Sequence, residues 1–278
     1  DSACHLQKAL YGLKQAPRAW HKRLKEELES MGFQASQADA SLFILRTGEH
    51  CTVWLLVYVD DLLIAASELE PIMMVKAKLQ SVFDVHDLGD AHFFLGMEIV
   101  RDRAARSLKL SQARLAKELL LKHGLHDAKA THVPMSPGLR LVKPACADER
   151  LDVSLHPYSE LVGSLLYLSV CTRPEIAYAV GALARFAACP STAHWKAAKG
   201  ILRYLAGTAS LGLVFGAGSS GLQGFCDADF AGDVETRRST TGFVFLLHGG
   251  AISWSSRLQR TVATSTACLL YTSDAADE

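Results

Sequence analysis

Two adjacent aspartates, Asp60 and Asp61, interrupt an apolar run in the segment LLVYVDDLLIAA, residues 55–66. Taking one unpaired carboxylate out of water is unfavourable, and two neighbouring carboxylates also repel each other. The pair therefore needs solvent, a cation or hydrogen-bond donors. Taken alone, the pair favours a polar surface turn, because aspartate is common in turns.

The apolar runs on both sides predict a buried β-hairpin whose tight connection contains the aspartates. Residues 53–59 and 62–66 each have the composition and length of a strand. Magnesium prefers oxygen ligands, commonly one or two carboxylates together with substrate phosphates. Two such ions can promote in-line phosphoryl transfer. Because successive strand side chains point to opposite faces, we expect Asp60 and Asp61 to contact metal unequally.

The remaining patterns predict an α+β chain. Residues 92–100 predict a strand with its return at 108–111, and a proline-rich linker covers 131–157. After Gly207, short apolar segments divided by glycines predict a second sheet, with Gly249-Gly250 as a hairpin turn. Helical spacing predicts helices over 18–32, 70–83, 110–124 and much of 158–205.

Composition excludes a strong global attraction to polyanions. The 278 residues carry 29 basic and 29 acidic side chains, although a local basic cleft stays possible on these numbers. Seven scattered cysteines without a C-x-x-C pair favour reduced, mostly buried thiols in an intracellular protein. The aspartates break the longest apolar run, so we expect no membrane span. Because Asp1 stands where methionine is expected, we interpret the chain as an internal piece of a longer protein.

Several motifs in a fixed order carry a family resemblance. They are LYGLKQAPRAW (10–20), YVDD (58–61), DLGDAHFFLGMEI (87–99) and GFCDADFAGD (224–233). The chain resembles the reverse transcriptase and RNase H region of copia-type LTR retrotransposon Pol polyproteins from about residue 4 to 267. The resemblance implies a partial reverse-transcriptase palm with thumb and connection helices, followed by a truncated RNase H-like α/β domain. The implied boundaries are 1–107 for fingers and palm, 108–211 for thumb and connection, and 212–267 for RNase H.

The resemblance assigns roles to the YVDD hairpin. Asp60 and Asp61 match two of the three palm aspartates that hold Mg²⁺, which Mn²⁺ can replace. Tyr58 and Val59 match the positions where the hairpin meets the primer end and the template.

It also assigns roles to the preceding motif. Gln15 matches the glutamine that contacts the incoming deoxynucleotide, and Lys14 and Arg18 are candidate phosphate contacts. Trp20 is interpreted as helix packing rather than base stacking. Two further basic residues are equally well explained as a solvated helix surface, namely Lys22 and Arg23.

Downstream, Gly96 and Met97 match the primer grip. Asp227 matches the first aspartate of the RNase H metal site, although an edge strand can also carry such a charge for solubility. The same two alternatives stay open for Asp229 and Asp233. The implied partners are an RNA template, a DNA primer, their RNA–DNA hybrid, deoxynucleotides and further polyprotein segments, in a cytoplasmic retrotransposon particle or in the nucleus.

Two features lead to an alternative hypothesis. The third palm carboxylate is expected upstream of residue 10, where Asp1 lacks a strand context. The RNase H glutamate is expected at position 270, which is Leu270. The alternative is a catalytically inactive nucleic-acid-binding remnant.

The last eleven residues, CLLYTSDAADE at 268–278, lack an amphipathic pattern. The transposase end CTGTCTCTTATACACATCT, translated from its second base and continued with GACGCTGCCGACGA, gives the same letters. We therefore interpret residues 268–278 as derived from a sequencing adapter, against the alternative of a divergent natural terminus.

Overall fold

The computed structural model describes residues 9–10, 12–48, 51–146, 149–216 and 220–265. It divides the chain into two units, Asp1–Phe94 and Leu95–Glu278, and each is described by itself. The expectations for Asp1, for Leu270 and for residues 268–278 lie outside the described residues. The domain boundaries expected from the sequence stay predictions.

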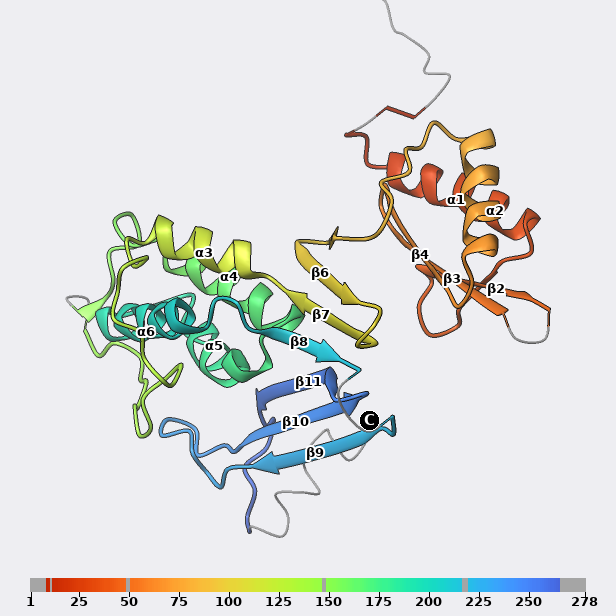
Figure 1. Cartoon of the computed structure of the whole chain (residues 1–278). Helices are drawn as coiled ribbons and strands as arrows, with labels where there is room; N and C mark the ends of the chain where they lie inside the picture. Colours follow the sequence, from red (N-terminus) through yellow and green to blue (C-terminus); the bar gives the residue numbers. More distant parts are fainter. Residues whose placement is uncertain (1–8, 11, 49–50, 147–148, 217–219, 266–278) are drawn as a thin grey trace, which may run out of the picture. The chain divides into compact units, whose positions relative to one another are not determined.

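The first unit contains a four-stranded antiparallel sheet in the order β1-β2-β3-β4 and two helices (Figure 1). Its elements are α1 (Ala16–Ser30), β1 (Gln34–Ala35), β2 (Leu42–Thr47), β3 (Cys51–Tyr58), β4 (Asp61–Ala66), α2 (Leu69–Val82) and β5 (Phe93–Phe94).

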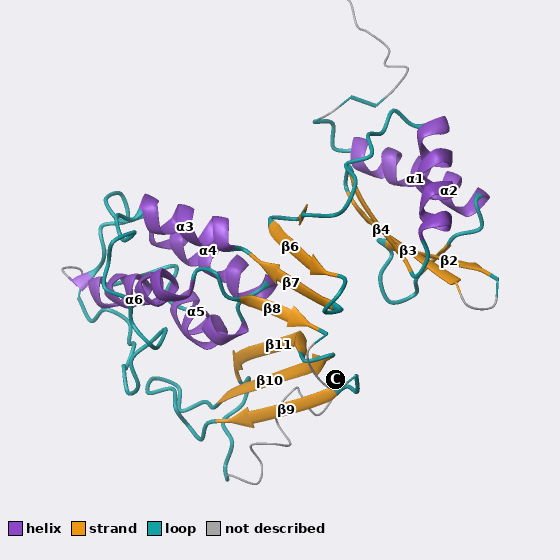
Figure 2. Ribbon diagram, in the orientation of Figure 1, coloured by secondary structure: helices purple, strands orange, loops and turns teal. Residues whose placement is uncertain are grey.

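One face of this sheet packs on both helices. Val53, Leu55 and Val57 of β3 are buried in a cluster that includes Leu28 of α1 and Leu79 of α2. The alternate β3 side chains face away from that cluster: Trp54 is 44% and Tyr58 56% exposed, and Thr52 and Leu56 are half-buried. The hairpin predicted over 53–66 is confirmed, but the prediction that it is buried is wrong for one face. The reason is that α1 and α2 lie on the same side of the sheet (Figure 2).

The second unit combines a helical core with two antiparallel sheets. Strands β6, β7 and β8 are consecutive neighbours in one sheet, and the other has the order β11-β10-β9. The elements are β6 (Met97–Asp102), β7 (Ser107–Ser111), α3 (Ala113–Lys122), α4 (Tyr158–Cys171), η2 (Pro174–Ile176), α5 (Ala177–Ala184), α6 (Thr192–Thr208), β8 (Gly212–Phe215), β9 (Gln223–Ala228), β10 (Thr240–Leu247) and β11 (Gly250–Leu258).

Three local expectations need correction. The continuous strand over 92–100 is wrong, because Leu95 and Gly96 have φ of 48° and 70°, which a strand cannot accommodate. The predicted hairpin turn lies one residue earlier, at His248-Gly249, since Leu247 pairs with Gly250. The cysteines are not mostly buried: of the five in the described residues, Cys51 is buried and two are exposed, Cys146 and Cys226.

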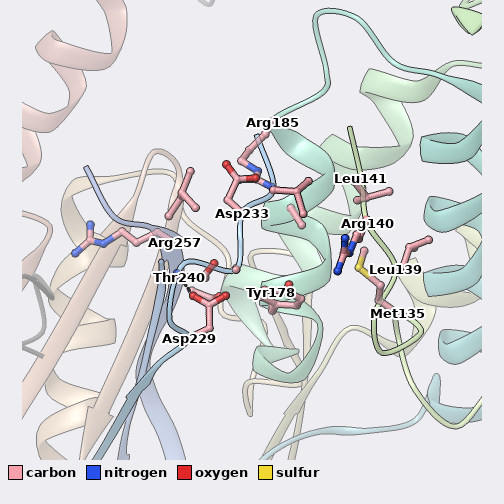
Figure 3. A pocket seen from close by; sticks show the side chains of 16 residues that line it. Met135, Leu139, Arg140, Leu141, Tyr178, Arg185, Asp229, Asp233, Thr240 and Arg257 are labelled. Carbon is pink, nitrogen blue, oxygen red and sulfur yellow. Dashed lines mark hydrogen bonds and ion pairs between the residues drawn. The ribbon is translucent and has the colours of Figure 1, made fainter. Parts of the chain in front are cut away.

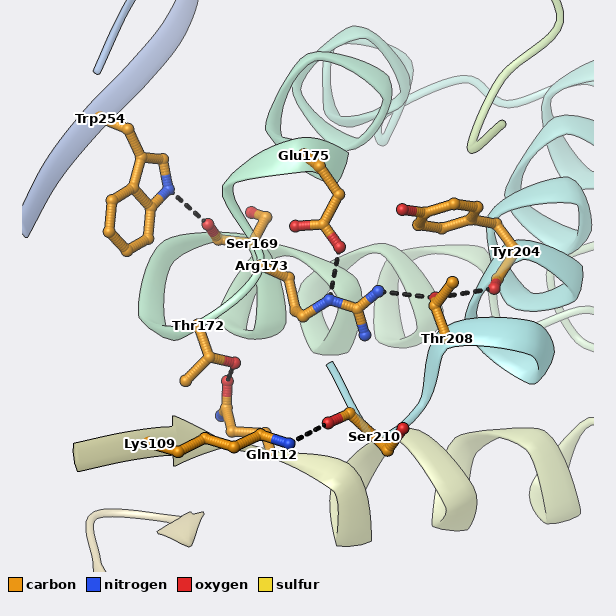
Figure 4. A network of polar contacts seen from close by, with 10 residues as sticks. All are labelled: Lys109, Gln112, Ser169, Thr172, Arg173, Glu175, Tyr204, Thr208, Ser210 and Trp254. Atoms are coloured by element: carbon orange, nitrogen blue, oxygen red, sulfur yellow. Dashed lines mark hydrogen bonds and ion pairs between the residues drawn. The ribbon is translucent and has the colours of Figure 1, made fainter. Parts of the chain in front are cut away.

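A buried arginine joins the ends of two helices in the second unit (Figure 4). Arg173 is 2% exposed, and its Nε donates to Glu175 Oε1 at 2.5 Å. Its Nη2 donates to Thr208 Oγ1 at 2.7 Å, and its guanidinium lies 5.8 Å from the Tyr204 ring centroid. Burying a charge is tolerated only where such partners satisfy it, so this network fixes the end of α4 against the end of α6.

The helices of the described residues include none that is long and apolar enough to cross a membrane.

A buried histidine caps helix α6. Ser191 donates its backbone N–H to His194 Nδ1 at 2.9 Å, and the His194 ring stacks on Phe186 with 4.0 Å between centroids. The Nε2 atom is buried and has no hydrogen-bond partner among the residues described. Burial lowers the pKa of His194 from its ordinary value, although the charge of Glu235 opposes the shift.

This environment predicts a pH-dependent stability. The unfolded chain takes up the His194 proton near pH 6.5, whereas the folded chain resists it until lower pH. Stability from neutral His194 is therefore fully present above about pH 6.5 and is lost as the pH falls, by at most about 1.4 kcal/mol per pH unit. Urea unfolding measured between pH 7.5 and 5 should show a shallower pH slope for His194→Gln. The exposed control His132→Gln should keep the slope of the unaltered chain; equal slopes in all three would contradict the prediction.

Candidate active site

The two aspartates lie at the tip of the β3–β4 hairpin. Tyr58 pairs with Asp61, which leaves Val59 and Asp60 as a two-residue loop. Directly opposed strand residues share a face, so Asp61 lies on the open face with Tyr58, whereas Asp60 belongs to the loop. Both aspartates are exposed, and Val59 is 53% exposed with φ of 54°. The tip thus presents two carboxylates to solvent beside an apolar and an aromatic side chain.

The nucleotide-motif residues surround the start of α1. Gln15 is the N-cap residue, and its side chain makes no capping hydrogen bond. Lys14, Gln15 and Arg18 are exposed, and no described carboxylate pairs with Lys14 or Arg18. Further along the helix, ion pairs join Lys22 to Glu26 at 3.9 Å and Arg23 to Glu27 at 2.7 Å. Of the four basic candidates, Lys14 and Arg18 are therefore the two without an ion pair among the described residues.

Trp20 connects α1 to the hairpin tip. Its ring packs edge-on against Phe83, with 5.2 Å between centroids, which confirms the interpretation as packing. In addition, its Nε1 donates a hydrogen bond to the Val59 carbonyl oxygen at 2.6 Å. Periodicity alone contains no signal for this bond, because it joins residues 39 positions apart. The bond brings the two motifs of the first unit together.

The expected primer-grip residues form a turn in the second unit. Tyr167 of α4 donates its hydroxyl to the Leu95 carbonyl oxygen at 2.6 Å. Gly96 follows with φ of 70°, and a Cβ there would lie 3.1 Å from the Tyr167 hydroxyl oxygen. Met97 begins β6 and is half-buried. Sequence reasoning missed Tyr167, which shapes the turn from more than seventy residues away.

Asp227 lies exposed on β9, directly opposite Gly242 of β10. The absence of a side chain at Gly242 leaves the neighbouring position on that face open. Asp227 Oδ1 accepts a hydrogen bond from the Ala228 N–H at 2.8 Å.

The two other acidic residues of this motif line a cavity of about 320 Å³ beside α5 (Figure 3). Asp229 accepts a hydrogen bond from the Thr240 backbone N–H. Asp233 pairs with Arg185 at 3.4 Å, and its side chain is 8% exposed. Burial alone would raise the pKa of Asp233, but hydrogen bonds from Thr236 and the Arg185 charge outweigh it, so the pKa is lowered. These partners favour a structural role for Asp233, whereas Asp229 is exposed, like Asp227.

The carboxylates near the hairpin tip are few. Among the described residues, no group of three or more His, Cys, Asp or Glu side chains comes together. Asp60 and Asp61 therefore form a pair of oxygen donors rather than an all-protein cage. A pair fits Mg²⁺, which commonly keeps waters and binds through one or two carboxylates and substrate phosphates.

Comparison with protein families defines the class of protein. A family model described as "Reverse transcriptase (RNA-dependent DNA polymerase)" matches residues 1–137, which include the hairpin and the start of α1. No solved structure matches the chain significantly.

Similar curated proteins narrow the class. The Pol polyprotein from transposon TNT 1-94 of Nicotiana tabacum is 44% identical over 95% of this chain and 20% of its own length. The Pol polyprotein from transposon RE2 of Arabidopsis thaliana is 39% identical over 96% of this chain and 18% of its own length. A transposon Ty5-1 protein of Saccharomyces cerevisiae is 31% identical over 92% of this chain and 82% of its own length. The chain belongs to the reverse transcriptases of copia-type retrotransposon Pol polyproteins, and spans about a fifth of the length of the first two relatives.

Two glycines in the second unit should respond oppositely to alanine. Gly96→Ala places a Cβ on left-handed backbone against Tyr167, which should lower the free energy of unfolding by about 1–2 kcal/mol. Gly163→Ala lies in the exposed middle of α4 with no atom near the new Cβ, and should raise it by about 0.5–1 kcal/mol. Urea denaturation followed by circular dichroism measures both. A change of the same sign in both variants would refute the left-handed turn.

Proposed function

We propose that the polyprotein containing this chain synthesises DNA on an RNA template, with Asp60 and Asp61 as its metal-binding carboxylates. The observation that carries the proposal is the exposed aspartate pair at the tip of a paired hairpin, in a chain of the reverse transcriptase family. The partners are an RNA template, a DNA primer and deoxynucleotides. The complete polyprotein would act in an intracellular retrotransposon particle, together with segments beyond this chain.

The side chains of the first unit would have different roles in the reaction. Asp60 and Asp61 would hold Mg²⁺, or Mn²⁺ in its place, and the ion when bound supplies charge neutralisation at the transferring phosphate. Lys14 and Arg18 would attract and orient phosphate groups, and Gln15 would contact the deoxynucleotide. Tyr58 and Val59 present 56% and 53% of their surface next to the carboxylates, which suits contact with the primer end and template.

We further propose an RNase H activity on the RNA–DNA hybrid, with Asp227 as one metal ligand. Its exposure on β9 opposite Gly242 supports this role over Asp233, whose buried carboxylate pairs with Arg185. Gly96 and Met97 would contact the primer from the turn that Tyr167 holds.

The two proposed sites can be tested against each other in the complete polyprotein. Asp60→Asn should reduce Mg²⁺-dependent primer extension by at least ~100-fold, because it removes a charged ligand of the ion that would neutralise the transferring phosphate. Asp60→Asn should leave degradation of the RNA strand of a hybrid unchanged. Asp227→Asn should reduce that degradation and leave primer extension unchanged. Each variant is the folding control of the other. Undiminished extension by Asp60→Asn would overturn the polymerase assignment, and undiminished RNA degradation by Asp227→Asn would overturn the RNase H assignment.

A second candidate function concerns residues 1–278 alone. The isolated chain is proposed to bind an RNA–DNA duplex weakly. It should not extend a primer, because the described residues bring no third carboxylate to Asp60 and Asp61. Primer extension above background by the isolated chain would refute this second candidate function.

The phosphate contacts of that binding can be counted from its salt dependence. Lys14→Ala and Arg18→Ala should each reduce the slope of log affinity against log salt by roughly 1, since each removes one phosphate contact. Arg23→Ala is the matched control, because Arg23 is paired with Glu27 at 2.7 Å on the same helix. Fluorescence anisotropy of a labelled duplex between 50 and 200 mM salt, roughly the range in which such contacts are lost, measures the slopes. Equal slopes for Lys14→Ala and Arg23→Ala would remove Lys14 from the interface.

A further inference from the structure

The hairpin tip contains an unfavourable backbone conformation. Val59 has φ of 54°, which is a rare value for a β-branched residue. Two-residue hairpin loops with positive φ ordinarily use glycine, asparagine or aspartate for this reason. The pairing of Tyr58 with Asp61 leaves only Val59 and Asp60 to reverse the chain. A contact outside the hairpin must therefore help to hold Val59 in this conformation.

Trp20 supplies such a contact. The indole N–H is a donor only, and it points at the Val59 carbonyl oxygen, 2.6 Å from Nε1. The indole itself is fixed by its edge-on contact with Phe83, which directly follows α2. Because Val59 lies in the loop, its carbonyl is not needed for the pairing of β3 with β4.

The bond acts on Asp60 through the peptide plane. The carbonyl of Val59 and the amide nitrogen of Asp60 belong to one planar unit, so fixing the direction of the carbonyl fixes the plane from which Asp60 starts. Asp61 follows at the first position of β4. Because the loop contains only Val59 and Asp60, a rotation of this plane would have to be taken up by these two residues.

We infer that Trp20 is a positioning residue, whose indole N–H holds the left-handed tip and thereby the directions of the Asp60 and Asp61 carboxylates. The inference rests on the proposed function in one respect: that these carboxylates bind a divalent metal. The alternative is that Trp20 only packs α1 against Phe83. The two differ in what the N–H contributes, since a phenyl ring at position 20 would keep the packing and lose the donor.

The test uses the 278-residue chain with ¹⁵N labelling and compares Trp20→Phe with Trp54→Phe. Trp54 lies on β3 of the same sheet, on the open face and 44% exposed, so it is a matched control. The Trp20 indole N–H should exchange with solvent more slowly than that of Trp54. Trp20→Phe should shift the amide resonances of Val59, Asp60 and Asp61, and Trp54→Phe should shift them much less.

The metal readout is Mn²⁺, followed by the broadening of the Asp60 and Asp61 amide resonances. Trp20→Phe should weaken Mn²⁺ binding by about 10-fold or more, the usual effect of removing a group that orients a metal ligand. Val59→Gly relieves the left-handed strain at the tip. Trp20→Phe should therefore shift the amide resonances of Asp60 and Asp61 less in the Val59→Gly variant than in the unaltered chain.

The outcomes separate the inference from the function on which it rests. Tip resonances and Mn²⁺ affinity in Trp20→Phe that match those of Trp54→Phe would overturn the positioning role. If Asp60→Asn leaves Mn²⁺ binding unchanged, the metal assignment fails instead, and the indole exchange and tip resonances then decide whether Trp20 holds the loop.

Discussion

The pairing of Tyr58 with Asp61 is the contact on which the candidate active site depends. The side-chain period of a strand is two, so a slip of one residue would turn one strand over relative to the other. Either Val57 would leave the core that α1 and α2 cover, or Asp61 would turn toward that core. Burial of the apolar face therefore specifies the register, and the register sets the position of the carboxylates. Stability and chemistry use the same sheet, with the core on one face and the acidic tip at its end.

Helix α4 has the corresponding role in the second unit. Its residue Tyr167 donates to the Leu95 carbonyl, and its Ser169 carbonyl accepts the indole N–H of Trp254 from β11 at 2.7 Å. The buried Arg173 then ties the end of the same helix to α6. A single element thus fixes the turn before β6, the last described strand and the helical core. Directional hydrogen bonds hold these contacts in place where apolar packing alone would permit sliding.

The sequence predicts the helices and strands whose formation depends on residues close together along the chain. The period of apolar residues located α1, α2 and α3, and the two strand-length runs located the YVDD hairpin. The strand β2 was missed, because its half-buried residues show no clear alternation. The break at Leu95-Gly96 was missed because it depends on Tyr167, and the pairing of β8 with β7 joins segments about one hundred residues apart. The candidate site shows the same contrast between local patterns and long-range contacts. Motifs identify its residues, but only the fold brings the Trp20 indole N–H to the Val59 carbonyl oxygen.

Carboxylates available to a cation can be separated from structural ones by what surrounds them. Asp233 lies 8% exposed beside Arg185 and accepts from Thr236, so a metal would have to replace bonds that the fold already makes. Asp61 and Asp227 are both exposed, and their strands β4 and β9 are the outermost of the strands described for their sheets. Magnesium gives up its waters reluctantly, so a site that supplies few ligands and leaves room for water and phosphate suits it better than a closed cage. The exposure of Asp61 and Asp227 would meet that requirement, and it keeps their charge out of the core.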